Sequence, residues 1–378
     1  MRVALISFHS FLEPGGVKTH ILSLSKEFKK NKIECKIAIP RRKLNENYGK
    51  DVILLGTSIP LIWGGGRGDL VFNFTPISIE RFLIKGEFNI LHFHNVSFPS
   101  FFQILLSPFS FRTTNILTFH SDIERSNFFQ NFSQLFDVLV GFCNLRLDGL
   151  IAVSKVALKY FEKFKKPKII IPNGVDLERF NSKNKKIKKF LDGKINLLFV
   201  GRIEERKGLI YLLKAYLILK QKYRNIRLIV AGDGPEKENC EKFVKENNLK
   251  DVIFLGSVEK ELPSLYATCD IFCAPSIFGE SFGLVILEAM ASGKPIVGFA
   301  NEGYKEILKE NKVGEFLAKP RDFKDLATKI EVLIKNKKIR QEIAEWGLKE
   351  VQNYSWEKIA KKVLDFYRLC EREKRSFI

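Results

Sequence analysis

The chain alternates short apolar segments with amphipathic helical segments, and it does so in two successive series. The first series contains RVALISF, CKIAIP, NILHFH, NILTFH and GLIAVS. The second contains INLLFVGR, RLIVAGDG, DVIFLGS, DIFCAPS and PIVGFA, most of which end near glycine, serine or proline. Helical spacing appears between the runs, as at Val17, Ile21, Leu24 and Phe28. Short apolar runs separated by helices predict parallel sheets that are covered on both faces.

The alternation is interrupted at KIIIPNGVDLERF and the basic stretch NSKNKKIKKFLDGK that follows it. We therefore predict two doubly wound, Rossmann-like α/β domains, residues 1–172 and 173–354. A chain of 378 residues is long enough to build two cores. The periodic segment YSWEKIAKKVLDFYRLCEREKR predicts a closing helix within residues 355–378 that returns to the first domain.

Lysine and arginine number 63 against 43 acidic residues, which gives a net charge of +20. Three interpretations fit this excess of positive charge: nucleic-acid binding, attraction to an anionic membrane, and a lysine-rich composition without function. The aromatic-plus-basic signature of a nucleic-acid module is absent, so a membrane surface is favoured over nucleic acid. No apolar run reaches the ~18–20 residues of a membrane span, and MRVALISF resembles a strand rather than a signal peptide. We expect a cytoplasmic protein whose six cysteines serve packing.

The loops that follow the strands are the places to look for a ligand, because such sheets bind ligands at the carboxyl ends of their strands. In EPGGVKTH, Gly15 and Gly16 stand between a strand and a helix. Glycine lets backbone N–H groups approach a phosphate at a helix N-terminus. The stretch is neither a Walker loop nor a dinucleotide fingerprint. A plain tight turn is the alternative.

The stretch VGRIEERKG places Arg202 at a strand end and Lys207 shortly before a helix. Arginine binds oxyanions bidentately and lysine acts as a point charge, so the pair suits a diphosphate. The alternative is a solvated charge run that includes Glu204, Glu205 and Arg206.

The stretch FGESFGLVILEAMASG carries two acids, Glu280 and Glu288, within an apolar segment. On one continuous helix they would lie about 80° apart, so they do not form a side-by-side acid pair. We predict that Glu280 lies in a loop and Glu288 two turns into a helix, with N–H groups near Ser281 to Gly283 forming an anion site. This arrangement fits a sugar nucleotide. In the alternative, Glu280 only stabilises the helix dipole and Glu288 is exposed.

All five histidines, at positions 9, 20, 92, 94 and 120, lie in the first third of the chain. His92 and His94 form an H-x-H pair, but no carboxylate or cysteine cluster accompanies them, so no metal site is predicted. His120 ends NILTFH and is the best candidate for a residue at a reacting centre, where imidazole offers a donor and an acceptor. A structural histidine is the alternative.

Together these motifs resemble those of the retaining glycosyltransferases of family 4. The resemblance rests on GESFGLVILEA with its two glutamates, and on GRIEERKG, IPNGVD, AGDGPE, FLGSV and IAVS. It covers almost the whole chain and implies the GT-B fold, in which two Rossmann-like domains face each other across a cleft. In the first domain, PGGVKTH, LHFHNVSFPS and LTFHSD are similar to the bacterial phosphatidyl-myo-inositol mannosyltransferases.

The resemblance implies a role for each matching residue. Arg202 and Lys207 grip the diphosphate, Glu280 contacts sugar hydroxyls and Glu288 holds the ribose. The residues implied to bind the donor are Gly15, Gly16, Arg202, Lys207, Val258, Glu280, Ser281, Phe282, Gly283, Leu284 and Glu288. The residues implied to be catalytic are His120, Glu280, Arg202 and Lys207, and those implied to bind the acceptor are His9, Lys18 and His120. No metal or other cofactor is implied.

The expected activity is transfer of mannose from GDP-mannose to a lipid-linked acceptor such as phosphatidylinositol, on the inner face of the membrane. His9 stands where the inositol-lipid enzymes have a tyrosine, Lys18 replaces a neutral residue, and only Arg81 and Lys85 stand for their basic membrane cluster. A family 4 enzyme with UDP-glucose or a similar donor and a soluble acceptor is the main alternative. A sugar-nucleotide epimerase and a basic nucleic-acid-binding protein are more remote alternatives.

Overall fold

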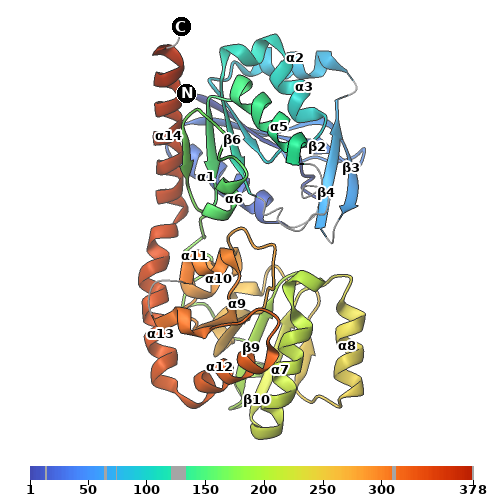
Figure 1. The fold of residues 1–378 in the computed structure, drawn as a ribbon, viewed down its shortest axis with the longest axis vertical. Coiled ribbons are helices and arrows are strands. Elements are labelled where there is room, and N and C mark those ends of the chain that lie inside the picture. Colours follow the sequence, from blue (N-terminus) through green and yellow to red (C-terminus); the bar gives the residue numbers. More distant parts are fainter. Residues whose placement is uncertain (13–14, 64–65, 74, 121–132, 309–311, 377–378) are drawn as a thin grey trace. The chain divides into compact units, whose positions relative to one another are not determined.

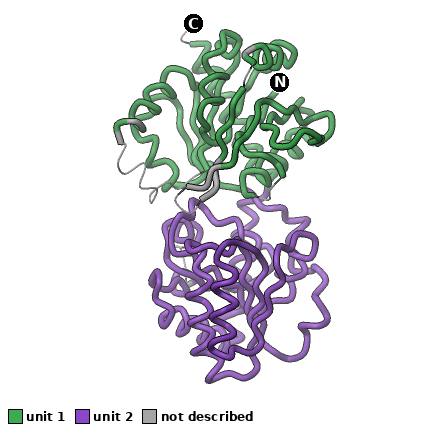
Figure 2. The backbone as a smooth tube through the Cα atoms, turned by 90° about the vertical axis from the view of Figure 1, so that its right-hand side faces the viewer, with its two compact units in different colours: residues 1–173, 356–378 green, residues 174–355 purple. Residues whose placement is uncertain are grey.

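The computed structural model describes residues 1–12, 15–63, 66–73, 75–120, 133–308 and 312–376. The chain divides into two compact units, which Figure 2 colours separately. Unit 1 is Met1–Asn173 with Trp356–Ile378, and unit 2 is Gly174–Ser355. Both divisions lie one residue from the boundaries that the sequence predicts, and the closing helix belongs to unit 1.

Unit 1 is built on an eight-stranded sheet. Its strands are β1 (Arg2–Ser7), β2 (Glu34–Arg41), β3 (Val52–Trp63), β4 (Gly66–Phe72), β5 (Ile90–His94), β6 (Thr114–Phe119), β7 (Gly149–Ala152) and β8 (Lys168–Ile170). They lie in the order β4-β3-β2-β1-β5-β6-β7-β8. Six of the neighbouring pairs are parallel, while β3 and β4 form an antiparallel pair that the sequence analysis did not predict.

Helices cover this sheet (Figure 1). They are α1 (Gly16–Lys30), α2 (Pro76–Gly86), α3 (Ser100–Leu106), η1 (Pro108–Arg112), α5 (Ser133–Arg146), α6 (Lys155–Lys159) and α14 (Trp356–Ser376). The apolar face of α14 packs against α1 and β6 and joins the buried core of the unit. At Gly149, a Cβ would lie 2.4 Å from the Cys370 sulfur, so glycine lets α14 approach β7 closely.

Unit 2 is built on a six-stranded parallel sheet. Its strands are β9 (Ile195–Val200), β10 (Ile226–Ala231), β11 (Val252–Phe254), β12 (Ile271–Ala274), β13 (Ile296–Phe299) and β14 (Leu317–Ala318). They lie in the order β11-β10-β9-β12-β13-β14. The helices are η2 (Lys188–Phe190), η3 (Glu205–Lys207), α7 (Leu209–Lys222), α8 (Lys237–Glu246), α9 (Leu262–Thr268), α10 (Leu284–Ala291), α11 (Glu302–Leu308), η4 (Lys312–Phe316), α12 (Phe323–Lys335), α13 (Lys337–Glu350) and η5 (Val351–Tyr354).

Each sheet has one place where the direction of strand addition reverses. In unit 1 the chain adds β2 and β3 on one side of β1, and then returns to place β5 on the other side. In unit 2 it adds β10 and β11 on one side of β9 and then places β12 on the other. Ligands bind beyond the carboxyl ends of the strands at such switch points. The topology therefore selects the loops after β1, β5, β9 and β12.

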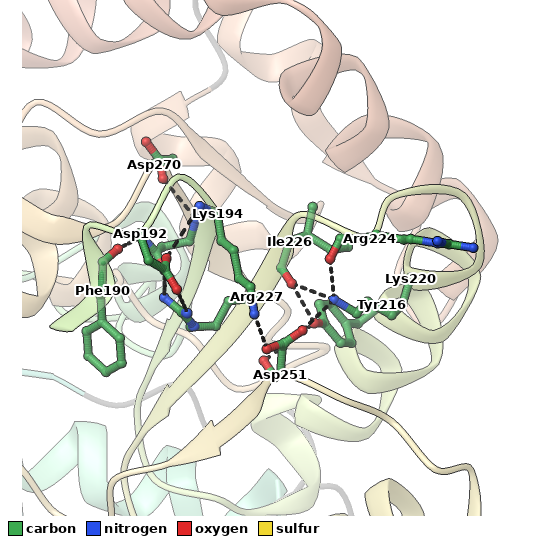
Figure 3. Close-up of polar contacts among 11 residues, drawn as sticks. Phe190, Asp192, Lys194, Tyr216, Lys220, Arg224, Ile226, Arg227, Asp251 and Asp270 are labelled. Atoms are coloured by element: carbon green, nitrogen blue, oxygen red, sulfur yellow. Dashed lines mark hydrogen bonds and ion pairs between the residues drawn. The ribbon is translucent and has the colours of Figure 1, made fainter.

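A charged network closes the opposite, amino-terminal edge of the unit 2 sheet (Figure 3). Buried Arg227, the second residue of β10, pairs with Asp192. Asp251, which precedes β11, accepts from Lys194 over 2.5 Å and from Lys220 of α7 over 2.7 Å. Burial opposes ionisation of Asp251, but the two lysines outweigh this effect and lower its pKa. The network therefore lies at the amino-terminal ends of the strands, away from the carboxyl ends at which ligands bind.

No helix among the described residues is long and apolar enough to cross a membrane. The six cysteines are free and buried.

Candidate active site

Two loops at the switch point of unit 2 form the candidate site. Residues 201–208 follow β9 and hold the motif GRIEERKG, while residues 275–283 follow β12 and hold FGESFG. Because β9 and β12 are neighbouring parallel strands, their carboxyl ends bring these loops together. The Ile277 amide donates to the Arg206 carbonyl over 2.8 Å. The fold thus joins two motifs that are far apart in the sequence.

Gly208 allows the two loops to pack this closely. Its φ of 66° lies in the left-handed region, which favours glycine. A Cβ at this position would also lie 2.1 Å from the carbonyl oxygen of Pro275. Both the backbone conformation and the close approach therefore require glycine at this position.

Glu280 lies buried at the centre of the two loops, with 8% of its surface exposed. Its carboxylate pairs with Lys207, accepts from the Ser276 hydroxyl over 3.0 Å, and lies 3.6 Å from the Arg206 guanidinium. Burial opposes ionisation, but the two cations outweigh it and hold the pKa of Glu280 below its ordinary value. The acid is therefore ionised at neutral pH, with its charge compensated from the neighbouring loop.

Residues around α11 support the Glu280 loop, and the sequence analysis did not single them out. The Tyr304 hydroxyl donates to the Ser276 hydroxyl oxygen over 3.0 Å, and the Asn301 amide donates to the Ser276 carbonyl over 2.9 Å. A Cβ at Gly303 would lie 2.1 Å from the Glu280 carbonyl oxygen, so only glycine lets α11 approach this loop. The available signal was NEGY, which follows the apolar run PIVGFA at another strand end.

The charges of GRIEERKG form an internal network. Glu204 is buried, lies 2.5 Å from the Arg206 guanidinium and 3.6 Å from that of Arg202. Arg206 also donates to the carbonyl of Gly279 over 3.1 Å. The alternative of a solvated charge run is therefore wrong for Glu204 and Arg206, because their charges face one another inside the loop. Arg206 instead joins the two loops of the site.

The helix α10 begins only at Leu284. The prediction that Glu288 lies two turns into this helix is therefore wrong, and Glu288 lies just over one turn in. The shift arises at Gly283, whose φ of 102° is incompatible with helix, so the preceding residues remain in the loop. The prediction that Glu280 is a loop residue is confirmed.

Glu288 is partly buried, and its carboxylate accepts from the Tyr266 hydroxyl over 2.8 Å. Burial raises its pKa to about 7, although the Tyr266 bond acts in the opposite direction. Its folded-state pKa thus exceeds the ordinary value of 4.5, so its contribution to stability is complete below pH 4.5 and is lost as pH rises through about 7.

We expect the melting temperature of the wild type to fall, relative to that of Glu288→Gln, by about 5 °C between pH 5 and pH 8. Calorimetric melts of both proteins across this range measure the difference. The other carboxylates titrate alike in both proteins, so their effects cancel in the difference between the two melting temperatures. A constant difference between the two curves would contradict the raised pKa.

The remaining predicted donor residues lie on different parts of the fold. Val258 follows β11 in a loop of unit 2, Phe282 is buried beside α10, and Leu284 begins that helix. Gly15 and Gly16 belong to unit 1, where Gly15 precedes α1 in an extended conformation that any residue adopts. A Cβ at Gly15 would meet no described atom within 4 Å. The described part of the fold does not itself require glycine at this position.

The predicted acceptor residues His9 and Lys18 lie at the carboxyl end of β1 and on α1. The His9 ring lies 3.7 Å from the Asp69 carboxylate, which Arg42 also contacts. Burial opposes ionisation of Asp69, but these neighbours outweigh it and lower its pKa. Lys18 donates to the Phe11 carbonyl over 2.7 Å. The sequence analysis missed Asp69 and Arg42, which are distant from His9 along the chain.

His120 follows β6 and joins three other histidines. Its Nε2 lies 3.1 Å from Nδ1 of His94, and its backbone N–H donates to the Asn95 side chain over 2.8 Å. His92 and His94 lie on one strand with ring centroids 4.2 Å apart. The fourth histidine, His20 of α1, contacts His120 edge to face at 4.7 Å. Burial lowers the pKa of His120 well below its ordinary value, so its ring is neutral at physiological pH.

Of the H-x-H pair His92 and His94, for which no metal site was predicted, His92 is held by other side chains. Both ring nitrogens of His92 are occupied, by the Tyr367 hydroxyl at 2.6 Å and the Thr118 hydroxyl at 2.5 Å. Among the described residues, the group that could hold a metal ion is His20, His94 and His120, with one nitrogen each within 4.8 Å.

Two family models match adjacent stretches of the chain. A model described as Glycosyltransferase Family 4 matches residues 14–179, and one described as Glycosyl transferases group 1 matches residues 180–350. The chain is a two-domain glycosyltransferase of the GT-B fold. The boundary between the two matches lies within seven residues of the division between the two units. The predicted family and the predicted fold are confirmed.

Curated relatives are similar to this glycosyltransferase along its whole length. The phosphatidyl-myo-inositol mannosyltransferase of Mycobacterium leprae is 28% identical over 374 residues, which cover 97% of this chain and 96% of the relative. The enzyme of that name from Mycobacterium tuberculosis H37Rv is 27% identical over 377 residues, covering 97% and 96%.

Solved structures share its fold. Anabaena HepE, in complex with UDP and glucose, superimposes with a TM-score of 0.77 at 21% identity, covering 97% of this chain and 99% of that one. Sucrose-phosphate synthase from Thermosynechococcus elongatus gives 0.75 at 20% identity, covering 98% and 99%.

Proposed function

We propose that this glycosyltransferase is a retaining enzyme that moves mannose from GDP-mannose to a lipid-linked acceptor such as phosphatidylinositol, at the cytoplasmic face of the membrane. The observation that carries the proposal is the similarity to phosphatidyl-myo-inositol mannosyltransferases over 97% of the chain, which extends through both units. The domain roles follow from it: unit 1 binds the acceptor and unit 2 the nucleotide sugar.

The donor chemistry is assigned to the two loops at the unit 2 switch point. As the glycosidic bond to the diphosphate breaks, negative charge develops on the leaving oxygen, and Arg202, Lys207 and the N-terminus of α10 offer positive charge there. Glu280 accepts hydrogen bonds from the sugar hydroxyls, and Glu288 from the ribose. Protein cations thus supply the stabilisation, and the proposed reaction needs no metal.

The acceptor chemistry is assigned to unit 1. His120 is neutral, and a neutral imidazole can donate one hydrogen bond and accept another beside the reacting carbon. His9 and Lys18, at the switch point of the unit 1 sheet, would contact the acceptor. Retention follows if the attacking and leaving oxygens share one face of the sugar.

An exposed apolar surface of unit 1 suits the proposed membrane attachment. The helices α2, α3 and η1 pack against one another, and α2 and α3 lie side by side in Figure 1. Phe98 precedes α3, Leu106 ends it and Phe111 lies in η1; their side chains are 64%, 62% and 58% exposed. The exposed cations of the same elements are Arg81, Lys85 and Arg112, and the exposed aliphatic residues of α2 are Ile77 and Ile84. Exposed apolar side chains and cations on the same elements favour an anionic lipid surface.

We expect the double variant Phe98→Ser/Phe111→Ser to bind vesicles containing phosphatidylinositol at least about tenfold more weakly than the wild type, because two aromatic anchors are lost. Cosedimentation at low salt measures binding. Leu191→Ser is the matched control, since Leu191 is 54% exposed in unit 2. Equal binding of all three proteins would remove this surface from the proposal.

One assay tests the function as a whole. The protein is incubated with a panel of nucleotide sugars, with phosphatidylinositol vesicles or soluble acceptors, and each product is identified by mass spectrometry and by anomeric NMR. We expect an α-mannosyl lipid from GDP-mannose. Transfer from UDP-glucose to a soluble acceptor would replace this function with another of the same class.

A further inference from the structure

His20 contacts both residues at which the chain passes between its two units. The chain leaves unit 1 after Asn173 and re-enters it at Trp356. The His20 ring nitrogen Nδ1 lies 2.8 Å from the Asn173 side-chain oxygen, and its ring meets that of Trp356 edge to face at 5.0 Å and 90°. These three residues lie within unit 1 and are separated by more than 150 positions of sequence.

The hydrogen bond with Asn173 determines which His20 nitrogen carries the proton. A carbonyl oxygen has no proton to give, so Nδ1–H of His20 donates to Asn173. Burial lowers the pKa of His20 to about 4, and the neutral ring therefore keeps its lone pair on Nε2. This buried Nε2 has no hydrogen-bond partner within the described part of the chain. Leaving a buried ring nitrogen unpaired costs stability.

His20 also contacts His120 and His94, the histidine that bonds to His120. His20 meets His120 at 4.7 Å with an interplanar angle of 82°, and His94 at 5.2 Å with 61°. His94 in turn stacks on His120 at 5.4 Å and bonds to it through a ring nitrogen. Perpendicular and stacked neighbours together limit how the His120 ring can turn.

We propose that His20 is a positioning residue, which sets the orientation of the His120 ring and makes that orientation depend on Asn173 and Trp356 at the two chain crossings. The proposal rests on the proposed function in one respect, that His120 faces the reacting centre. A backbone movement at Asn173 or Trp356 would then change the orientation of the His120 ring. The change would pass through side chains of unit 1. His20 itself touches neither donor nor acceptor in this role.

The test combines NMR and kinetics on the full chain. The protein has five histidines, so labelling with ¹⁵N-histidine gives five ring systems that single substitutions can assign. Asn173→Ala removes the acceptor of His20 without touching His120. We expect it to shift the His120 ring nitrogens and to lower kcat roughly ten- to hundredfold, with the donor KM within about twofold of the wild type. His20→Phe keeps a ring but loses the bond, and should behave alike.

Tyr367→Phe is the matched control. It also removes a buried hydrogen bond between a histidine and a distant segment, the bond to His92, but it leaves the contacts of His20 in place. We expect a lower melting temperature with kcat and the His120 signals retained. Unchanged His120 signals in Asn173→Ala and His20→Phe would overturn the proposal. So would stoichiometric zinc that is lost in His20→Phe, since the rings would then be metal ligands.

Failure of the proposed function is recognised separately. If no nucleotide sugar supports transfer, the spectra still report whether Asn173 controls the His120 ring. If Asn173→Ala shifts the His120 signals but leaves kcat unchanged, the proposed effect of His20 on catalysis is overturned. Lost transfer in every protein, the wild type included, would count against the function alone.

Discussion

Glu280→Gln is expected to lower kcat/KM by about two to three orders of magnitude while the fold is retained. The amide keeps the size of the side chain but removes the negative charge that pairs with Lys207 and faces Arg206. It also weakens the bonds proposed to the sugar hydroxyls, since a carboxylate accepts hydrogen bonds more strongly than an amide. Steady-state kinetics with the identified donor measure the loss, and circular dichroism checks the fold.

Glu205→Gln is the control for Glu280→Gln. Glu205 is an exposed acid of the neighbouring loop. The same substitution at this position should change kcat/KM less than twofold. Wild-type rates in Glu280→Gln would exclude Glu280 from the donor site. Equal losses in both variants would mean that the net charge of the loops matters and the buried position does not.

Arg202→Ala is expected to lower kcat by about a hundredfold, because one of the cations assigned to the leaving diphosphate is lost. Arg202 is partly exposed, and its weak contact with Glu204 at 3.6 Å leaves its guanidinium available to a ligand. Arg202→Lys should recover part of the rate, since lysine restores the charge but not bidentate binding. Single-turnover rates at saturating donor measure the effect on the transfer step.

Arg224→Ala is the control for Arg202→Ala, because Arg224 is exposed in the turn after α7, beside the amino-terminal network of Figure 3. We expect it to retain the wild-type rate. Unchanged turnover in Arg202→Ala would contradict the assignment of this cation. A rise in donor KM without a change in kcat would assign Arg202 to ground-state binding instead.

Much of the fold could be predicted from the sequence because its signals are local. The apolar runs from RVALISF to PIVGFA each form a strand that pairs in parallel with its neighbours, and the helical spacing at Val17, Ile21, Leu24 and Phe28 lies in α1, Gly16–Lys30. The paired strands β3 and β4 were missed, since they do not follow the alternation of strand and helix. The late start of α10 was missed because it depends on the conformation of one glycine, Gly283.

The candidate site was predicted only in its separate parts. The motifs named Arg202, Lys207 and Glu280, but nothing local to either stretch shows that Lys207 and Glu280 pair across 73 positions. The supporting Tyr304 and Gly303 were missed for the same reason, because their contacts with the Glu280 loop exist only after β12 and β13 become neighbours.

By itself the sequence determined the class of fold, the family resemblance and the loops that carry charge, because strand and helix periodicity and motif spacing are properties of neighbouring residues. The tertiary structure alone decided which charges are buried together. It also decided that His92 bonds to Tyr367, and that His20 contacts Asn173, Trp356 and His120. These contacts depend on the order of strands in each sheet and on the return of α14, and burial then determines the protonation of each group.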